Sequence, residues 1–271
     1  MIKDITLGQY YQTSSPIHKL DPRIKIVLLI VLLVFIYCAS NIFSVIFVAL
    51  FFGFIIILSK VPISLYFKNL KVILPILLFT TLVNVFYNAE GVKLVDFWII
   101  HITSGGIAKA LLLALRIVML ILISSTLTYT TSPNDLTDGI ERLLSPLKYV
   151  GLANGIHTLS MMLTIALRFI PTLIEETEKI MNAQKARGAD FETGKLSDRI
   201  KALIPILIPL LLSSFRRSYE LADAMECRCY NGGKGKQRMK QLNLTKSDYI
   251  TLVIVAVFCA GVILLNIIFR G

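Results

Sequence analysis

Residues 24–59 read IKIVLLIVLLVFIYCASNIFSVIFVALFFGFIIILS, and Lys25 is the only charged side chain among them. One helical crossing of a bilayer takes roughly 17–25 residues, so this run is long enough for two. The polar pair Ser40-Asn41 divides it into predicted spans at about 24–40 and 42–59. The two spans form a tight hairpin, or one of them is partly re-entrant. The stretch places the chain among polytopic membrane proteins.

The rest of the chain has the same character. Of its 271 residues 55% are hydrophobic and 17% are charged, which is far from the composition of a soluble domain. Three further apolar runs predict spans at about 71–88, 106–128 and 247–269. We therefore expect an all-α polytopic membrane protein with about five transmembrane helices. The polar residues before the first apolar run do not have the design of a signal peptide.

Basic residues predict the orientation of these spans. Lys19, Arg23 and Lys25 adjoin the start of the first span, and residues 129–246 hold most of the remaining lysines and arginines. Short loops rich in Lys and Arg lie in the cytoplasm, which places the N-terminus inside and the C-terminus outside the cell membrane. The same rule accounts for the net charge of +11, so we expect no nucleic-acid partner.

Three regions follow from this topology. We predict an N-terminal transmembrane bundle at 1–128, a cytoplasmic domain at 129–246 and a C-terminal transmembrane helix at 247–271. A helix from Pro133 to about Lys148, capped by Ser132 or Asn134, should open the cytoplasmic domain. Two long helices should follow, from about 156 to 187 and from near Asp198 to before Asn231.

Each long helix has an apolar half followed by a charged half, with kinks expected at Pro171, Pro205 and Pro209. The apolar halves are mostly too short and too rich in proline to span a bilayer. They are expected at the cytoplasmic interface, where they pack on one another and on other membrane components. The alternative for each side chain is the protein's own core.

Both long helices end in the same pattern, in which a small or apolar pair spaced i, i+3 is followed by an arginine at i+7. The two units are Ile180, Ala183, Arg187 and Leu221, Ala224, Arg228. On a helix these positions share one face, and a cation suits the negative C-terminal end. We interpret the pair as two arginine-tipped helices that grip a partner outside the membrane.

Patterns for catalysis or metal binding are weak. The chain has neither a Walker phosphate loop nor a G-x-S-x-G elbow, and its three histidines, His18, His101 and His157, are scattered. The acidic cluster at 175–178 is more typical of a solvated face, and a single C-x-C at 227–229 is weak evidence for metal. We expect no cofactor and no metal. Arg116, inside the fourth span, is either functional, snorkelling or satisfied within the bundle.

Three motifs resemble the T components of energy-coupling factor (ECF) transporters. They are Leu20-Asp21-Pro22-Arg23-Ile24-Lys25, Leu167-Arg168-Phe169-Ile170-Pro171 and Gln184-Lys185-Ala186-Arg187-Gly188. The resemblance covers essentially the whole chain and its four-span, cytoplasmic-domain, one-span layout. One departure is visible, because the family commonly has two Ala-Arg-Gly motifs and the second here reads Cys227-Arg228-Cys229. The charge of the arginine carries over, whereas the tight glycine cap does not.

The resemblance implies a coupling subunit of an ABC-type importer that is neither the ATPase nor the substrate binder. Two cytoplasmic ATPase subunits would bind the arginine-tipped helices. The docking residues would be Arg187, Arg228, Ala186, Gly188, Ala183 and Ala224. ATP-driven closure would move these helices and topple a small membrane-embedded S component, which releases a vitamin or metal ion inward. We expect the S component to contact Met161, Leu163, Ile170 and Leu207.

Three alternatives stay open at this point. The chain could be the T component of a dedicated cobalt or nickel importer, which encodes its own substrate-binding subunit nearby. It could be a membrane-embedded enzyme acting on lipid, in which case Glu176→Gln would abolish activity of the isolated subunit. It could also be an ordinary ABC permease, although its spans contain little besides Arg116 that would recognise a polar solute.

Overall fold

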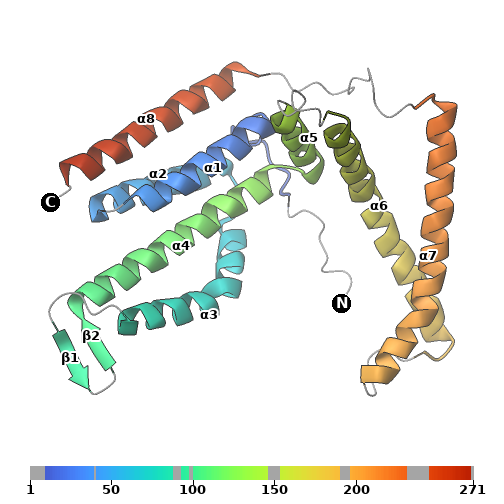
Figure 1. The fold of residues 1–271 in the computed structure, drawn as a ribbon, viewed down its shortest axis with the longest axis horizontal. Helices are drawn as coiled ribbons and strands as arrows, with labels where there is room; N and C mark the ends of the chain where they lie inside the picture. The colour runs from blue at the N-terminus through green and yellow to red at the C-terminus, as the bar shows by residue number, and fades with distance from the viewer. Residues whose placement is uncertain are drawn as a thin grey trace. The chain divides into compact units, whose positions relative to one another are not determined.

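The computed structural model describes residues 10–39, 41–87, 93–97, 100–145, 153–189, 196–230 and 244–269. Within these ranges the chain forms helices and one antiparallel hairpin (Figure 1). The helices are α1 (Pro22–Cys38), α2 (Ile42–Ser59), α3 (Ile63–Tyr87), α4 (Ser104–Thr130), α5 (Pro133–Leu144), α6 (Ala153–Ala186), α7 (Leu196–Cys227) and α8 (Lys246–Ile268). The hairpin strands are β1 (Lys93–Phe97) and β2 (Ile100–Thr103). Apart from this short hairpin, which the sequence analysis left as a loop, the predicted all-α class is confirmed.

Five helices are long and apolar enough to cross a membrane, among the residues that the structure describes. They are α2, α3, α4, α6 and α8. The predicted spans at 42–59, 71–88, 106–128 and 247–269 correspond to α2, α3, α4 and α8, and α3 begins several residues earlier than predicted. The predicted span at 24–40 is helical as α1, whose 17 residues are at the lower limit for a crossing. By length and composition α6 also qualifies, which the sequence analysis did not expect.

The chain divides into two compact units, each of which is described by itself. Among the described residues, the bundle unit comprises 10–139 and 244–269, and the crossed-helix unit comprises 140–230. α5 begins in the bundle unit. Its first turn is capped by Ser132, because the Ser132 hydroxyl accepts the Asp135 backbone N–H at 3.1 Å, as the sequence predicts.

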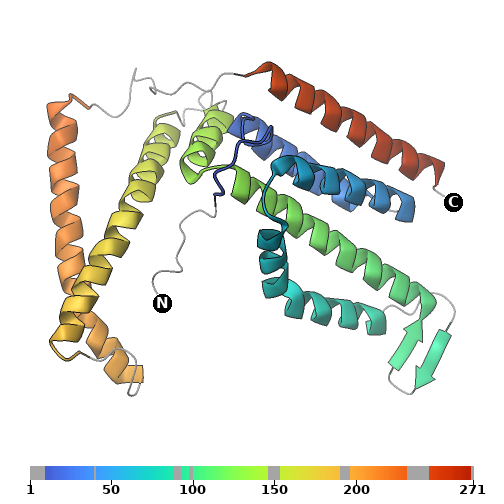
Figure 2. The same cartoon turned by 180° about the vertical axis from the view of Figure 1, so that it is seen from behind.

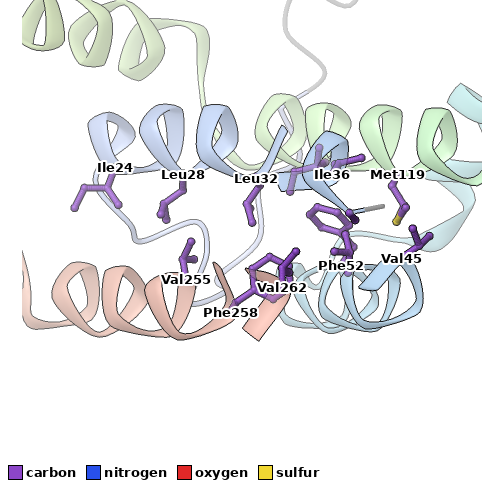
Figure 3. Packing of buried hydrophobic residues seen from close by; sticks show 13 residues of the cluster. Ile24, Leu28, Leu32, Ile36, Val45, Phe52, Met119, Val255, Phe258 and Val262 are labelled. Atoms are coloured by element: carbon purple, nitrogen blue, oxygen red, sulfur yellow. The ribbon is translucent and has the colours of Figure 1, made fainter. Parts of the chain in front are cut away.

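The core of the bundle unit is an apolar cluster shared by α1, α2, α4 and α8. α1 contributes one stripe, because its buried side chains recur at every fourth position and so lie on one helix face. Figure 3 shows how these side chains meet those of the other helices. The labelled members are Ile24, Leu28, Leu32, Ile36, Val45, Phe52, Met119, Val255, Phe258 and Val262.

A second, smaller cluster of buried side chains lies where α3 packs on α4. The Tyr66 and Tyr129 rings meet edge to face at 5.3 Å between centroids. The Tyr129 hydroxyl donates to the Leu65 carbonyl at 3.1 Å, and the Tyr66 hydroxyl lies 3.1 Å from the Thr126 hydroxyl. α3 contains Pro75 and bends along its length (Figure 1).

A buried polar clasp closes one end of the bundle unit. Lys25, 7% exposed, donates from Nζ to the carbonyls of Thr130 at 2.9 Å and His18 at 3.2 Å. Thr130 ends α4, so the ammonium supplies a hydrogen-bond donor to a carbonyl at the negative end of that helix. His18 bonds the Ser15 hydroxyl and the Tyr11 carbonyl through its two ring nitrogens, and burial lowers its pKa, so the neutral ring fits.

Asp248, at 0% exposure, forms the other half of this clasp. Its Oδ1 accepts the Asp21 N–H at 2.9 Å, and its Oδ2 accepts the Thr245 N–H at 2.7 Å and hydroxyl at 2.8 Å. Asp21 in turn caps α1 and pairs with Arg23 at 2.9 Å. The Leu20-to-Lys25 motif therefore joins the starts of α1 and α8 to the end of α4.

Asparagine side chains close the opposite end of the bundle unit. Asn41 donates to the Phe269 carbonyl at 2.7 Å, and Asn266 donates to the Cys38 carbonyl at 2.6 Å. Between Asp248 and Phe269, α8 rises by roughly 31 Å, close to the roughly 30 Å of a hydrocarbon core. The two polar ends are therefore spaced like the two surfaces of a bilayer.

Arg116 belongs to this second polar end. Its Nη2 donates to the carbonyl of Ala39, the C-cap of α1, at 2.8 Å, and its guanidinium lies 5.6 Å from the Tyr37 ring centroid. Of the three readings left open for Arg116, the structure favours a partner within the bundle.

We predict that Asp248→Asn destabilises the bundle unit by about 1–3 kcal/mol. The amide would place an N–H donor against a backbone donor and leave one of them buried without an acceptor. The midpoint of thermal unfolding in detergent should fall, whereas Asp223→Asn, an exposed aspartate on α7, should leave it unchanged. Equal midpoints for wild type and Asp248→Asn would show that the clasp contributes little.

Candidate coupling site

α6 and α7 cross one another in both views of the fold (Figures 1 and 2). Ile206 of α7 is buried, at 6% exposure, and Arg217 Nη2 contacts Glu176 Oε2 at 2.6 Å. This ion pair connects the charged half of α6 to α7. The predicted helices at 156–187 and from 198 onward are confirmed in extent, and both stay helical through their prolines.

The end of α6 has the geometry of a Schellman cap. Gly188 adopts φ +89°, its N–H donates to the Lys185 carbonyl at 3.0 Å, and the Ala189 N–H donates to the Gln184 carbonyl at 3.0 Å. These are the two reversed bonds that define the cap, and the left-handed residue is usually glycine because a side chain is disfavoured there. Arg187 is the last residue before this reversal.

The end of α7 has the same geometry without a glycine. Cys229 adopts φ +53°, its N–H donates to the Glu226 carbonyl at 2.8 Å, and the Tyr230 N–H donates to the Met225 carbonyl at 3.0 Å. The geometry that the resemblance did not carry over to the second motif is therefore kept. Arg228 occupies the same cap position as Arg187.

The side chains at both helix ends are open to solvent. All six predicted docking residues are exposed, and neither arginine side chain has a polar partner in the described part of the chain. The six are Arg187, Arg228, Ala186, Gly188, Ala183 and Ala224. The C-terminal ends of α6 and α7 lie at opposite ends of the crossed pair (Figure 2), so the unit presents two separate arginine tips.

The second feature of this unit is an apolar face on α7. Its members recur with helical spacing from 203 to 219 and lie roughly opposite buried Ile206. They are Leu203, Ile204, Leu207, Ile208, Leu211, Leu212, Phe215 and Tyr219, each at least 48% exposed. The sequence predicts an apolar first half for this helix, with Leu207 as its contact residue, and in the structure the exposed apolar face extends further, to Tyr219.

On α6 the predicted contact residues divide into two groups. Leu163 is exposed, together with its neighbours Leu159 and Met162, whereas Met161 and Ile170 are half-buried. Of the four residues expected to contact an S component, Leu163 and Leu207 are thus the more accessible in this chain.

The acidic cluster of α6 includes one carboxylate that is held in an ion pair. Glu176 is paired with Arg217, and Glu175 is exposed. No group of three or more His, Cys, Asp or Glu side chains that could hold a metal ion occurs in the described ranges. The unit thus presents two arginine tips and an exposed apolar face.

Comparison with known proteins identifies the family of this chain. The model of the CbiQ family, described as cobalt transport protein, matches residues 13–240. The chain is 45% identical to the energy-coupling factor transporter transmembrane protein EcfT of Ruminiclostridium cellulolyticum, over 99% of this chain and 100% of that protein. The chain belongs to the T components of ECF transporters. Proteins of the same name from Clostridium kluyveri (46%, 97% of each chain) and Bacillus subtilis (40%, 96% and 97%) are also similar.

Family membership agrees with the membrane character of the chain. As a T component it is a multi-pass transmembrane subunit of a transporter, which agrees with its five candidate spans. The resemblance noted from the three short motifs is confirmed over nearly the full length.

The two caps should respond differently to alanine. Gly188→Ala forces a side chain into the left-handed region and should weaken the α6 cap by about 1 kcal/mol. The loss of stability does not come from a steric clash, because a Cβ at Gly188 would meet nothing within 4 Å. Cys229→Ala exchanges one side chain for another in the same region and should be neutral.

Hydrogen exchange measures this difference at Ala189 and Tyr230, whose amides close the two caps. We expect exchange at Ala189 to become about fivefold faster in Gly188→Ala and exchange at Tyr230 to stay unchanged in Cys229→Ala. Equal responses at the two ends would contradict the shared cap geometry.

Proposed function

We propose that this T component couples two ATPase subunits to a membrane-embedded S component during import of a vitamin or other micronutrient. The observation that supports the proposal is the pair of identical caps, each of which presents one arginine at an opposite end of the crossed helices. Two like tips on one chain suit two like partners. The chain itself has no catalytic role in this proposal.

The chemistry of the tips suits docking to a protein groove. A guanidinium is permanently charged and offers a planar fork to carboxylate and carbonyl acceptors. Ala183 and Ala224, each about one turn before its arginine, are small and exposed, so a partner can approach each helix closely. The Schellman caps turn the chain away immediately after the arginine, which leaves each tip accessible.

The apolar face of α7, with Leu163 of α6, is the proposed seat of the S component. An exposed apolar face of this length on a subunit of a larger assembly is typical of an interaction site. Its period continues through two prolines, and a helix that contains prolines lacks some backbone hydrogen bonds and so offers a deformable surface to exchangeable partners.

The orientation of the units remains a proposal from charge. The predicted regions at 1–128, 129–246 and 247–271, with the middle one cytoplasmic, place both arginine tips on the side where ATP is available. Import through this chain in the other orientation would leave the tips without nucleotide-driven partners.

A dedicated cobalt or nickel importer is the second candidate, because the matching family model carries the description cobalt transport protein. The relatives at 40–46% identity carry the ECF name without a substrate. Purification of the complex followed by mass spectrometry of its subunits separates the two, since several S components indicate a shared coupling subunit and one metal-specific subunit indicates a dedicated importer.

Charge reversal at the tips tests the coupling role. In Arg187→Glu, Arg228→Glu we expect ATPase recovery in pull-downs to fall at least about 30-fold and uptake to be abolished. Truncating one side of a desolvated charge pair at an interface costs about 2–5 kcal/mol. Membrane insertion should be normal, because neither arginine lies in an apolar segment.

The matched control is Lys179→Glu, Arg216→Glu, which reverses two exposed charges on the same helices away from the tips. It makes the same change in net charge and should retain the ATPases and uptake. Normal uptake in Arg187→Glu, Arg228→Glu would contradict the coupling proposal, and the enzyme alternative would then have to be tested.

Variants of the apolar face test the seat of the S component. Leu163→Glu, Leu207→Glu should release the S component from detergent-solubilised complexes and keep the ATPases, because charges replace exposed apolar contacts without disturbing the crossing. Leu163→Met, Leu207→Met should keep both partners. If the glutamate variant retains the S component, this face has another role.

A further inference from the structure

A cavity of about 180 Å³ lies inside the bundle unit between α1, α2, α4 and α8. Its walls are mainly aliphatic and aromatic, and they include Leu28, Leu32, Phe54 and Ile254. Phe54 and Ile254 are about half exposed, at 54% and 46%, so the cavity opens where α2 and α8 meet the surroundings.

A pair of stacked aromatic rings from α2 and α8 closes the end of the cavity that is farther from Lys25. The rings of Phe51 and Phe258 lie 4.0 Å apart between centroids, and Phe51 also lines the cavity. Ser247 and Thr251 of α8 line the opposite end, next to the clasp lysine Lys25. From Phe258 to Ser247 the helix rises by about 16 Å, which is close to half of a roughly 30 Å hydrocarbon core.

The depth of the cavity therefore matches one leaflet of a bilayer. An apolar cavity of this size excludes water and takes up apolar molecules. In a membrane protein the apolar medium at such an opening is lipid, and a hydrocarbon chain that enters between α2 and α8 fills the space without leaving a polar group unsatisfied.

Three lysines lie near the polar end of the cavity, the end that Ser247 and Thr251 line. Lys19, Lys60 and Lys246 are exposed, and each lies within two residues of a side chain that lines the cavity. Three carboxylates act on the nearby Lys25. Asp21 and Asp248 are buried, at 5% and 0% exposure, and already accept hydrogen bonds, and the half-buried Asp135 accepts the Ser132 hydroxyl at 2.7 Å. An anionic headgroup thus meets lysines at the rim, while these acids are already engaged.

We propose that the cavity holds one acyl chain of an anionic phospholipid from the leaflet that contacts the N-terminal end of α1. The lipid fills the opening between α2 and α8 and its headgroup lies among the rim lysines. This site is independent of ATPase docking, so its test and the test of the coupling proposal can fail separately.

Lipid retention tests the cavity. The purified protein is exchanged into detergent with equal amounts of phosphatidylglycerol and phosphatidylcholine that have identical chains, and retained lipid is counted by native mass spectrometry. We expect about one phosphatidylglycerol per wild-type chain. Thr251→Trp, which fills the cavity from its wall, should lose this lipid, whereas Val253→Trp, 62% exposed on the same helix and outside the cavity, should keep it.

Rim variants test the headgroup. In wild type we expect at least about a fivefold preference for phosphatidylglycerol over phosphatidylcholine. Lys19→Gln, Lys246→Gln should remove the preference and still retain a lipid, whereas the exposed α3 variant Lys68→Gln should keep it. Equal retention in wild type and Thr251→Trp, or no preference in wild type, would overturn the proposal.

Discussion

Backbone groups at helix ends have no partners within their own helix, and inside a bilayer water does not supply them. In this chain that constraint is met by a few side chains placed at the two ends of one bundle. Lys25 donates to a carbonyl at the end of α4, and Arg116 donates to a carbonyl at the end of α1. Asp248 accepts backbone N–H groups from the segments that start α1 and α8. The apolar core between these ends does not by itself fix how the helices are aligned along their axes, because aliphatic side chains can pack in many ways. The polar ends fix which helices are neighbours and at what height.

The same constraint has a different solution at the ends of α6 and α7. There the chain reverses through Schellman caps that satisfy the last carbonyls internally, so the arginine side chains are not needed to cap their own helices. Each guanidinium is therefore available to a partner. An arginine such as Arg217, which is held by Glu176, joins the two helices to each other instead. Position relative to the cap separates the structural cations from those proposed to dock.

Most of the helices and the candidate site could be predicted from the sequence, because apolar runs and charge bias are local signals. Four predicted spans, both long helices and the arginine tips follow from periodicity and composition. The role of the Leu20-to-Lys25 motif could not be derived in this way, since Asp248 is 227 positions away from Asp21. The α7 cap was missed because cysteine is uncommon in the left-handed region, and only the backbone shows that it replaces glycine there. The apolar half of α7 was predicted, but not its continuation to Phe215 and Tyr219, because these two aromatic residues stand among the charged residues of the second half.

In the proposed complex one chain holds two ATPase subunits, one at each tip. Site-specific photo-crosslinking from position 183 and position 224 in a single chain tests it, since both alanines are exposed beside their arginines. With both positions carrying a photoreactive phenylalanine analogue, illumination of assembled complexes should give a product that joins one T component to two ATPase subunits. Either position alone should join it to one. If the doubly substituted chain joins only one ATPase subunit, or if either tip reacts with none, the two-tip account is contradicted.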